Sequence, residues 1–194
     1  MFFEPDIIPL VPRFVEEKEE EYVGAARGTA YHGLMEWLDY NAADTADDIE
    51  KQLKALTSVN KLKEAEASCI RIKDVLVFLA SPVGKRMKQA ALSEKLFREQ
   101  PFVISVSAAE LNSDWDGEET VLVQGIIDAY FYEEEELVLV DYKTDYVRPG
   151  EESRLVELYH VQLEDYAKAL ERMTGKRVKE KYIYSFTLGK EIEV

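Results

Sequence analysis

The sequence predicts a mixed α/β (α+β) fold, in which a central sheet is flanked by helices and preceded by an N-terminal helical region. Three observations support this prediction. Apolar residues recur at helical spacing in the first half of the chain, up to residue 92. β-Branched and aromatic residues then dominate up to residue 142, as they do in strands. A long helical pattern follows over 152–174, which would cover one face of the sheet while the earlier helices cover the other.

The N-terminal part of the chain is expected to hold four helices after an irregular, Pro-rich start. Residues 1–26 are interpreted as a tether or linker, so that the folded domain spans 27–194. A first helix is predicted over 29–40 with Thr29 as its N-cap, and a second over 44–57, capped by Asp44 or Thr45. Two more are predicted over 65–80 and, after Ser81-Pro82, over 83–92.

The second half is expected to contain strands and one long helix. Strands are predicted over 94–99, 101–108, 121–132 and 137–142, and the chain should close with a strand over 179–188. The helix over 152–174 should end at Gly175. Four consecutive glutamates at 133–136 repel one another and therefore indicate a solvent-exposed turn between the third and fourth of these strands.

The register of that hairpin brings charged residues together. If the turn is centred between Glu134 and Glu135, Asp128 faces Asp141 across the two strands. Lys143 then lies on the same face as Asp141, because side chains alternate with a period of two. Two carboxylates directly opposite each other destabilise a sheet, and a cation between them would reverse that effect. Mg²⁺ or Mn²⁺ suits such oxygen ligands.

Lys143 would then hold an attacking water or stabilise charge on a phosphate. The alternative is that these residues form an ordinary solvated charge cluster, because 32% of the chain is charged.

Two further pairs share a helix face at a spacing of four residues. His32 and Glu36 form the first pair, in which the imidazole could complete a metal site and Glu36 could orient or pair with it. Gln162 and Tyr166 form the second, and they could face the site and contact phosphate or a base. A structural role for His32 and a core role for Tyr166 are the alternatives.

Composition excludes several classes of function. The net charge of −15 argues against nonspecific nucleic-acid binding through a broad basic surface. The single cysteine excludes a four-cysteine iron–sulfur cluster held by this chain, and it favours an intracellular, cytoplasmic location. No apolar run is long enough for a membrane span, and no secretory signal is visible. The phosphate-loop and dinucleotide motifs are missing, so no nucleotide cofactor is expected.

Four motifs occur in an order that resembles a known family. They are Gly28-Thr-Ala-Tyr-His32-Gly-Leu-Met-Glu36, Gly125-Ile-Ile-Asp128, Asp141-Tyr-Lys143-Thr-Asp145 and Tyr159-His-Val-Gln162-Leu-Glu-Asp-Tyr166. Together they resemble the RecB-like nuclease domain of the PD-(D/E)XK superfamily, in particular the nuclease domains of bacterial helicase–nucleases of the AddA type. Arg98-Glu-Gln-Pro-Phe102 and the last eleven residues also resemble that branch. The resemblance implies the restriction-endonuclease-like core of that superfamily.

The resemblance also implies roles for individual residues. His32, Asp128 and Asp141 would bind Mg²⁺ or Mn²⁺ together with the backbone carbonyl of Tyr142, and Lys143 would be catalytic. Gln162 and Tyr166 would support the site or the DNA strand.

The implied activity is that of a DNA exonuclease domain in a helicase–nuclease that processes double-strand breaks for recombinational repair. Its partners would be single-stranded DNA, a helicase part of the same polypeptide and a second subunit, with no membrane involved. A stand-alone RecB-like exonuclease and a non-catalytic interaction module with a nuclease-like fold are the alternatives.

Overall fold

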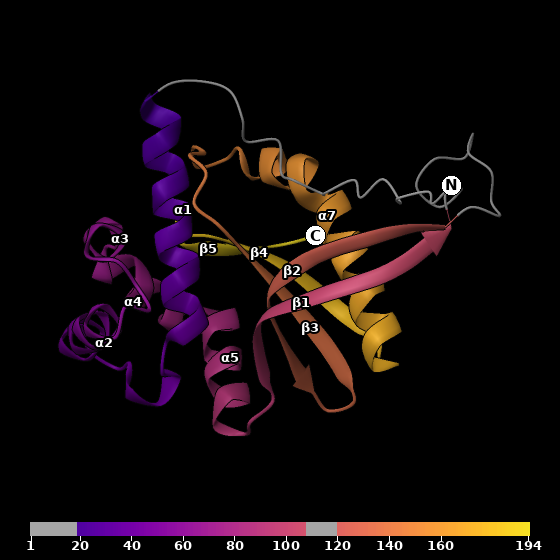
Figure 1. Ribbon diagram of the computed structural model, residues 1–194, viewed down its shortest axis with the longest axis horizontal. Coiled ribbons are helices and arrows are strands. Elements are labelled where there is room, and N and C mark those ends of the chain that lie inside the picture. The colour runs from indigo at the N-terminus through magenta and orange to yellow at the C-terminus, as the bar shows by residue number, and fades with distance from the viewer. Residues whose placement is uncertain (1–18, 108–119) are drawn as a thin grey trace, which may run out of the picture.

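The computed structural model describes residues 19–107 and 120–194, which form a five-stranded mixed sheet with helices on both faces (Figure 1). The strands lie side by side in sequence order: β1 (Leu96–Ser107), β2 (Thr120–Glu133), β3 (Glu136–Lys143), β4 (Val178–Ser185) and β5 (Lys190–Glu193). Only the neighbours β3 and β4 are parallel, and the other pairs are antiparallel. The predicted fold class is therefore confirmed.

The helices form two layers on opposite faces of this sheet (Figure 1). The N-terminal layer consists of α1 (Glu19–Trp37), the 3-10 helix η1 (Tyr40–Ala42), α2 (Ala46–Ser58), α3 (Glu64–Cys69), α4 (Ile72–Ala80) and α5 (Pro82–Leu92). The other layer is the single long helix α7 (Glu152–Thr174), which connects the parallel strands β3 and β4. In the part of the chain that the structure describes, no helix has the length and apolar character needed to cross a bilayer.

Each helical layer has its own apolar core against the sheet. On the N-terminal side, aromatic rings of the helices meet those of the strands: Phe78 of α4 packs edge-on against Tyr142 of β3 with ring centroids 5.9 Å apart. On the other side, Leu155, Leu163 and Leu170 of α7 pack against the sheet and are fully buried. The sheet is thereby buried on both faces near β3, which is why β3 is almost continuously apolar.

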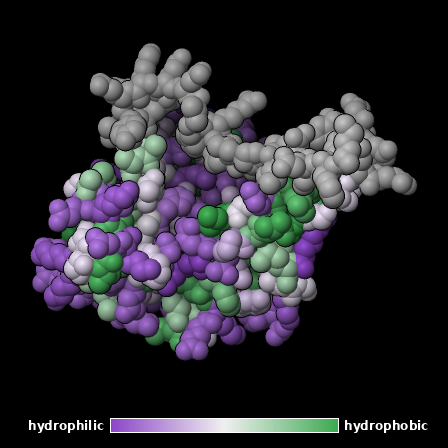
Figure 2. Space-filling view, viewed as in Figure 1, coloured by the Kyte–Doolittle hydropathy of each residue, from purple (hydrophilic) through white to green (hydrophobic). Residues whose placement is uncertain are grey.

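The strands β1 and β2 form a long arm that extends beyond the N-terminal helices (Figure 1). Their inner face packs on the core of α7, whereas apolar side chains gather on the surface of the arm (Figure 2). The exposed apolar residues of the arm are Val103, Leu122 and Ile126.

Several sequence-based predictions are confirmed by the local structure. Thr45 caps α2 in a capping box with Asp48, and Ser81 caps α5. Gly175 ends α7 in the left-handed conformation, with φ 68°. The hairpin register is also as predicted, because Glu133 pairs with Glu136 at the turn.

The predicted N-cap at Thr29 is wrong. Helix α1 begins at Glu19, inside the predicted tether 1–26, whose first 18 residues lie outside the described part of the chain. Thr29 is an interior residue whose hydroxyl donates to the carbonyl of Ala25. The helix also passes through Gly28, where an added Cβ would lie 3.4 Å from Thr144 Oγ1, at ordinary contact distance from the loop after β3.

The predicted helix over 65–80 is broken into α3 and α4. The residues at the break, Ile70 and Arg71, are extended, and Ile70 is buried. The backbone N–H of Arg71 donates to the Tyr31 hydroxyl at 3.2 Å instead of to a helical carbonyl. A tertiary hydrogen bond together with burial of Ile70 therefore overrides the helical pattern.

Two strand predictions also differ from the structure. The segments 94–99 and 101–108 form the single strand β1, because Pro101 lies on an edge strand, where a missing N–H donor is tolerated. The last segment, 179–188, is divided: β4 ends at Ser185, and β5 follows a turn that contains Gly189 at φ 67°.

The junction of α4 and α5 gives a testable prediction for the fold. A Cβ on Gly84 would lie 1.9 Å from the carbonyl oxygen of Phe78, a distance that the backbone cannot accept without moving α5 away from α4. We expect Gly84→Ala to lower the free energy of unfolding by about 3 kcal/mol, as measured by urea denaturation.

The control for this prediction is Gly24→Ala. Gly24 lies in α1 with no atom within 4 Å of the added Cβ, so this change should raise stability by up to about 1 kcal/mol. Equal effects of the two substitutions would contradict the packing at the junction.

Candidate active site

The predicted site residues converge where β2 and β3 separate, between α1 and α7. The pairing of these strands ends at Ala129 and Val140, in the predicted register. Beyond this point the backbone N–H of Tyr142 donates to Asp128 Oδ2 at 2.8 Å. Asp128 and Asp141, which are 8% and 1% exposed, thus occupy the buried end of the hairpin.

The strands β1 and β2 both reverse their side-chain alternation at this point. Ala129 and Phe131 of β2 face the N-terminal core, whereas Ile127 and Val123, which are also odd-numbered, face the core of α7. In β1 the corresponding reversal lies at Glu99, whose φ is +47° although it is not a glycine. The reversal leaves Asp128 at the boundary between the two cores, where side chains from both helical layers can reach it.

Helix α1 contributes His32 to the site. Its Nε2 atom lies 3.1 Å from the carbonyl oxygen of Tyr142, and its Nδ1 atom lies 3.3 Å from Asp128 Oδ1. Burial alone would lower the pKa of His32, but the carboxylate of Asp128 raises it to about 9. The imidazole is therefore held between two oxygen acceptors as a cation, which also keeps the pKa of Asp128 below its ordinary value against the effect of burial.

The orientation of α1 is fixed by a polar network one turn away from His32. Arg27 forms an ion pair with Asp74 of α4 and donates to the carbonyl of Thr144, and the Tyr31 hydroxyl donates to Asp74 at 2.6 Å. These contacts connect α1 to α4 and to the loop after β3. They give a structural role to Tyr31 within the motif around His32 and to Arg27 directly before it.

On the α7 side, Asp141 and Lys143 form a buried ion pair. Lys143 Nζ lies 2.7 Å from Asp141 Oδ2, which has no other polar partner among the described residues. Burial raises the pKa of Asp141 to about 6, with Asp128 acting in the same direction and Lys143 opposing it. Burial alone would lower the pKa of Lys143, but the two aspartates raise it above its ordinary value. Lys143 is therefore a permanent cation.

Helix α7 supports this lysine through Gln162 and Tyr159. Lys143 Nζ lies 3.4 Å from Gln162 Oε1 and 4.2 Å from the centre of the Tyr159 ring. Gln162 in turn donates to the Tyr166 hydroxyl at 2.7 Å. The structure thus connects Gln162 and Tyr166 to the site, as the four-residue spacing indicated.

The position of the Tyr166 ring depends on a glycine of the predicted motif. Phe102 of β1 packs edge-on against Tyr166, with centroids 5.6 Å apart. A Cβ on Gly125 would lie 2.8 Å from the Phe102 ring and 3.5 Å from the ring of Tyr166. Gly125 therefore leaves the space in which these two rings meet beside the site.

Two glutamates differ from the sequence-based expectation. Glu36 was expected to orient or pair with His32, but the acidic partners of His32 in the described structure are Asp128 and Glu99. Glu99 is a site residue that sequence reasoning missed, although it lies in the run Arg98-Glu-Gln-Pro-Phe102. Burial and the charge of Asp128 raise the pKa of Glu99 to about 7. Its backbone is left-handed, with φ +47°, and no turn motif in the sequence indicates this conformation.

This arrangement offers a donor set for a divalent cation. His32, Glu99 and Asp128 each provide one ligand atom, and these atoms all lie within 4.8 Å of one another. The backbone carbonyl of Tyr142 lies 3.1 Å from His32 Nε2, and the buried carboxylate of Asp141 interacts electrostatically with Asp128 and His32. Carboxylate and carbonyl oxygens with one imidazole suit a hard cation such as Mg²⁺ or Mn²⁺.

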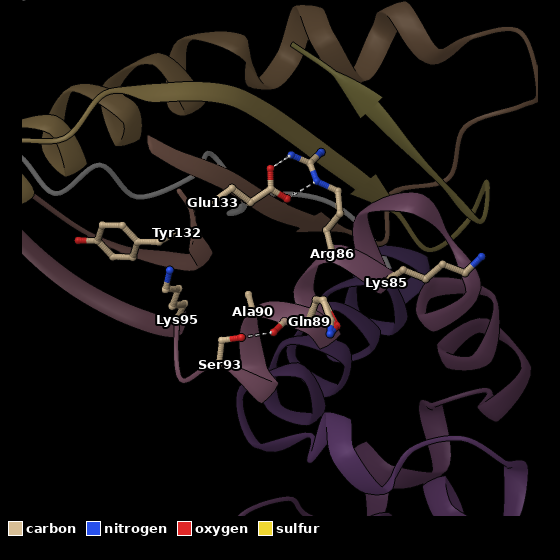
Figure 3. Close-up of a pocket in the computed structure, with 8 residues that line it drawn as sticks. All are labelled: Lys85, Arg86, Gln89, Ala90, Ser93, Lys95, Tyr132 and Glu133. Atoms are coloured by element: carbon tan, nitrogen blue, oxygen red, sulfur yellow. Dashed lines mark hydrogen bonds and ion pairs between the residues drawn. The ribbon is translucent and has the colours of Figure 1, made fainter. Parts of the chain in front are cut away.

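A basic cluster of α5, formed by Lys85, Arg86 and Lys88, does not belong to this site. Arg86 pairs with both oxygens of Glu133, at 2.7 and 2.8 Å, at the edge of a shallow pocket that contains none of the site residues (Figure 3). Lys88 pairs with Asp44. Carboxylates thus compensate two of the three cations, so this cluster offers little uncompensated charge for binding a phosphate.

Comparisons with known proteins indicate the family of the chain. The family described as the PD-(D/E)XK nuclease superfamily matches residues 11–191. The AddA subunit of the ATP-dependent helicase/nuclease from Clostridium novyi (strain NT) is 37% identical over 187 residues, which make up 94% of this chain and 15% of that protein. The corresponding protein from Acetivibrio thermocellus is 42% identical over 193 residues, 96% of this chain and 15% of that protein. The chain thus spans about 15% of the length of these relatives.

A solved structure described as "Crystal structure of SSO0001" covers 92% of this chain at 11% identity with a TM-score of 0.38. A TM-score of 0.38 does not establish a shared fold.

The raised pKa of His32 gives a testable prediction for cation binding. Below its pKa of about 9, His32 is protonated and must release the proton before it can bind an ion. We expect the affinity for Mn²⁺ to rise about tenfold per pH unit between about pH 7 and 8.5. Calorimetric titration in two buffers of different ionisation enthalpy would count the released proton.

His32→Gln serves as the control for this pH dependence. The variant should bind Mn²⁺ more weakly, and it should lose the dependence above about pH 7. An affinity of the parent chain that does not change with pH would contradict ligation by His32.

Proposed function

The chain belongs to the PD-(D/E)XK nuclease superfamily, and on this basis we propose that it is a Mg²⁺- or Mn²⁺-dependent deoxyribonuclease domain that hydrolyses phosphodiester bonds. The observation that carries this proposal is the convergence of His32, Asp128, Asp141 and Lys143 at one end of the β2–β3 hairpin. Three different elements supply these groups. Burial opposes the charged form of each group, so a purely structural charge cluster would be costly here.

We propose that His32, Asp128, Asp141 and the backbone carbonyl of Tyr142 hold the cation. Two observations support the fit of these residues to a cation: the chemistry of the donor set and the environment of Asp141 Oδ2. This carboxylate oxygen is buried, and its one polar partner among the described residues is the Lys143 ammonium. A bound ion would supply Lewis-acid polarisation of the phosphodiester and activation of the attacking water. The ion would also offset the repulsion between the two aspartates, which Lys143 and His32 compensate in the protein alone.

Lys143 would stabilise the negative charge that develops on the phosphate. Its raised pKa keeps it protonated, so it acts as a donor and a charge rather than as a general base. Gln162 and the ring of Tyr159 hold the ammonium group in position. The side chains of Gln162 and Tyr166, which are connected to Lys143, would contact and support the bound DNA strand.

The relatives support a proposal for the biological setting. Both are AddA subunits of an ATP-dependent helicase/nuclease, and this chain matches only a small part of each. We therefore propose that it is the nuclease domain of such a helicase–nuclease. In that setting it would act as an exonuclease on a single DNA strand that the helicase part of the same polypeptide delivers. We further propose that the complex contains a second subunit, and that it processes double-strand breaks for recombinational repair.

Loss of the charged pair tests the proposal. We expect Asp141→Asn and Lys143→Ala each to lower Mg²⁺-dependent cleavage of a labelled single-stranded oligonucleotide by about 10²-fold or more. The Lys143→Ala chain should remain folded, because Asp141, with a pKa raised to about 6, can take up a proton when the ammonium is gone.

The matched control is Lys190→Ala. Lys190 is half-exposed and pairs with Glu152 away from the site, so this variant should cut at the rate of the parent chain. Cleavage by the Asp141 and Lys143 variants at the parental rate, with unchanged thermal melting, would refute the assignment of the site.

A further inference from the structure

Tyr146, in the segment between β3 and α7, is the most exposed of the large apolar side chains in the described part of the chain, with 80% of its surface accessible. Given the nuclease site of the proposed function, on which this inference rests, we propose that Tyr146 and Arg148 form a binding subsite for the DNA strand next to the phosphate that is cut. The ring of Tyr146 stacks on a base, and the guanidinium of Arg148 pairs with a neighbouring phosphate. The subsite accepts a single strand of any sequence, because every base has a π face.

The first argument is the connection of this segment to the site. Tyr146 comes three residues after Lys143, so their Cα atoms are at most about 11 Å apart. Asp145 accepts a hydrogen bond from the Tyr159 hydroxyl at 3.0 Å, and the centre of the same ring lies 4.2 Å from Lys143 Nζ. Val147 is buried in the core beneath α7. Tyr146 is therefore held between two anchored neighbours, close to the ammonium group that the proposed function places at the phosphate.

The second argument is the side of the segment on which Tyr146 lies. The segment passes beside α1 on its way to α7 (Figure 1). Its odd-numbered side chains are directed toward α7: Lys143, Asp145 and Val147. Side chains of an extended segment alternate, so Tyr146 lies on the other side, together with Thr144. Thr144 Oγ1 would contact an added Cβ on Gly28, one turn of α1 before His32. Tyr146 is thus on the side of the segment that faces the helix of the site.

The third argument is that neither side chain has a partner in the described part of the chain. The ring of Tyr146 makes no hydrogen bond or ring contact there, and the guanidinium of Arg148 is exposed and makes no ion pair. Other arginines each pair with a carboxylate: Arg27, Arg71, Arg86, Arg154 and Arg177. An uncompensated guanidinium beside a nuclease site is available for a phosphate.

The fourth argument is the charge of the chain. A net charge of −15 repels a phosphate backbone, and carboxylates compensate many of the cations. Stacking of a base on an aromatic ring does not depend on net charge, and its loss weakens binding of a strand by a factor of about 5 to 100. An exposed ring is therefore a contact that even an acidic chain can offer to the strand beside its site.

The experiment compares Mg²⁺-dependent cleavage of two strands of equal length, one of thymidines and one of abasic nucleotides. Both carry the same number of phosphates, so only the first can stack. We expect Tyr146→Ala to raise KM for the thymidine strand about tenfold, with kcat changed less than about twofold and KM for the abasic strand unchanged. Tyr146→Leu, which keeps an apolar side chain without a ring, should behave like Tyr146→Ala. Tyr146→Trp should keep the parental KM.

Arg148→Ala should have a different signature. Loss of a phosphate contact raises KM for both strands, and it makes the dependence of log(1/KM) on log salt concentration shallower by about 0.7. Arg154→Ala is the matched control. It removes the same charge near the start of α7, but Arg154 pairs with Glu151, so this variant should keep the salt dependence of the parent.

Three outcomes would overturn parts of this inference separately. An unchanged KM in Tyr146→Ala, or an equal rise for both strands, would overturn stacking by Tyr146. Parental KM and salt dependence in Arg148→Ala would overturn the phosphate contact. A parent chain that cuts neither strand, or whose cleavage does not respond to Asp141→Asn, would instead overturn the proposed function and, with it, the subsite.

Discussion

Charge balance among buried groups is the constraint on which the site depends. Asp128 and Asp141 lie next to each other at the end of a hairpin, with almost no exposure to water. Two such carboxylates would lower stability unless cations accompany them. The protein alone meets this requirement with Lys143 on one side and a protonated His32 on the other. Because a neutral imidazole can bind a metal ion, the same residue that balances charge in the protein alone can become a ligand when an ion replaces its proton.

The fold brings these groups together by interrupting regular structure at one level of the sheet. The β2–β3 pairing ends, the alternation of β1 and β2 reverses, and a side chain replaces a backbone acceptor for Tyr142. Gly125 permits the close contact with the Phe102 ring that this arrangement needs. The helical layers then supply His32 from one face and Gln162 from the other, so the site lies where both cores end.

The sequence was sufficient for those features that depend on local chemistry. The acidic turn was enough to predict the register of the hairpin. Asp141 and Lys143 could be placed on one face, because the alternation of side chains is a property of the strand itself. Features that depend on tertiary contacts could not be predicted from the sequence. The break between α3 and α4 depends on a hydrogen bond to the Tyr31 hydroxyl. The position of Glu99 involves a left-handed backbone conformation that no turn motif in the sequence indicates. Glu36 shows the limit of spacing arguments, because a shared helix face does not decide which acid reaches a histidine.

The acidic surface bears on how a DNA strand could be held. The chain carries a net charge of −15, and many cations of the described residues pair with carboxylates, as Arg86 does with Glu133 and Lys190 with Glu152. Affinity for a phosphate backbone comes mainly from uncompensated Lys and Arg side chains, so this chain by itself offers little of it. A nuclease domain built in this way can work with weak binding if another part of the polypeptide delivers the strand. In the proposed helicase–nuclease, attraction to DNA and phosphodiester cleavage would then reside in different domains, and only the phosphate that reaches Lys143 and the metal ligands would be cut.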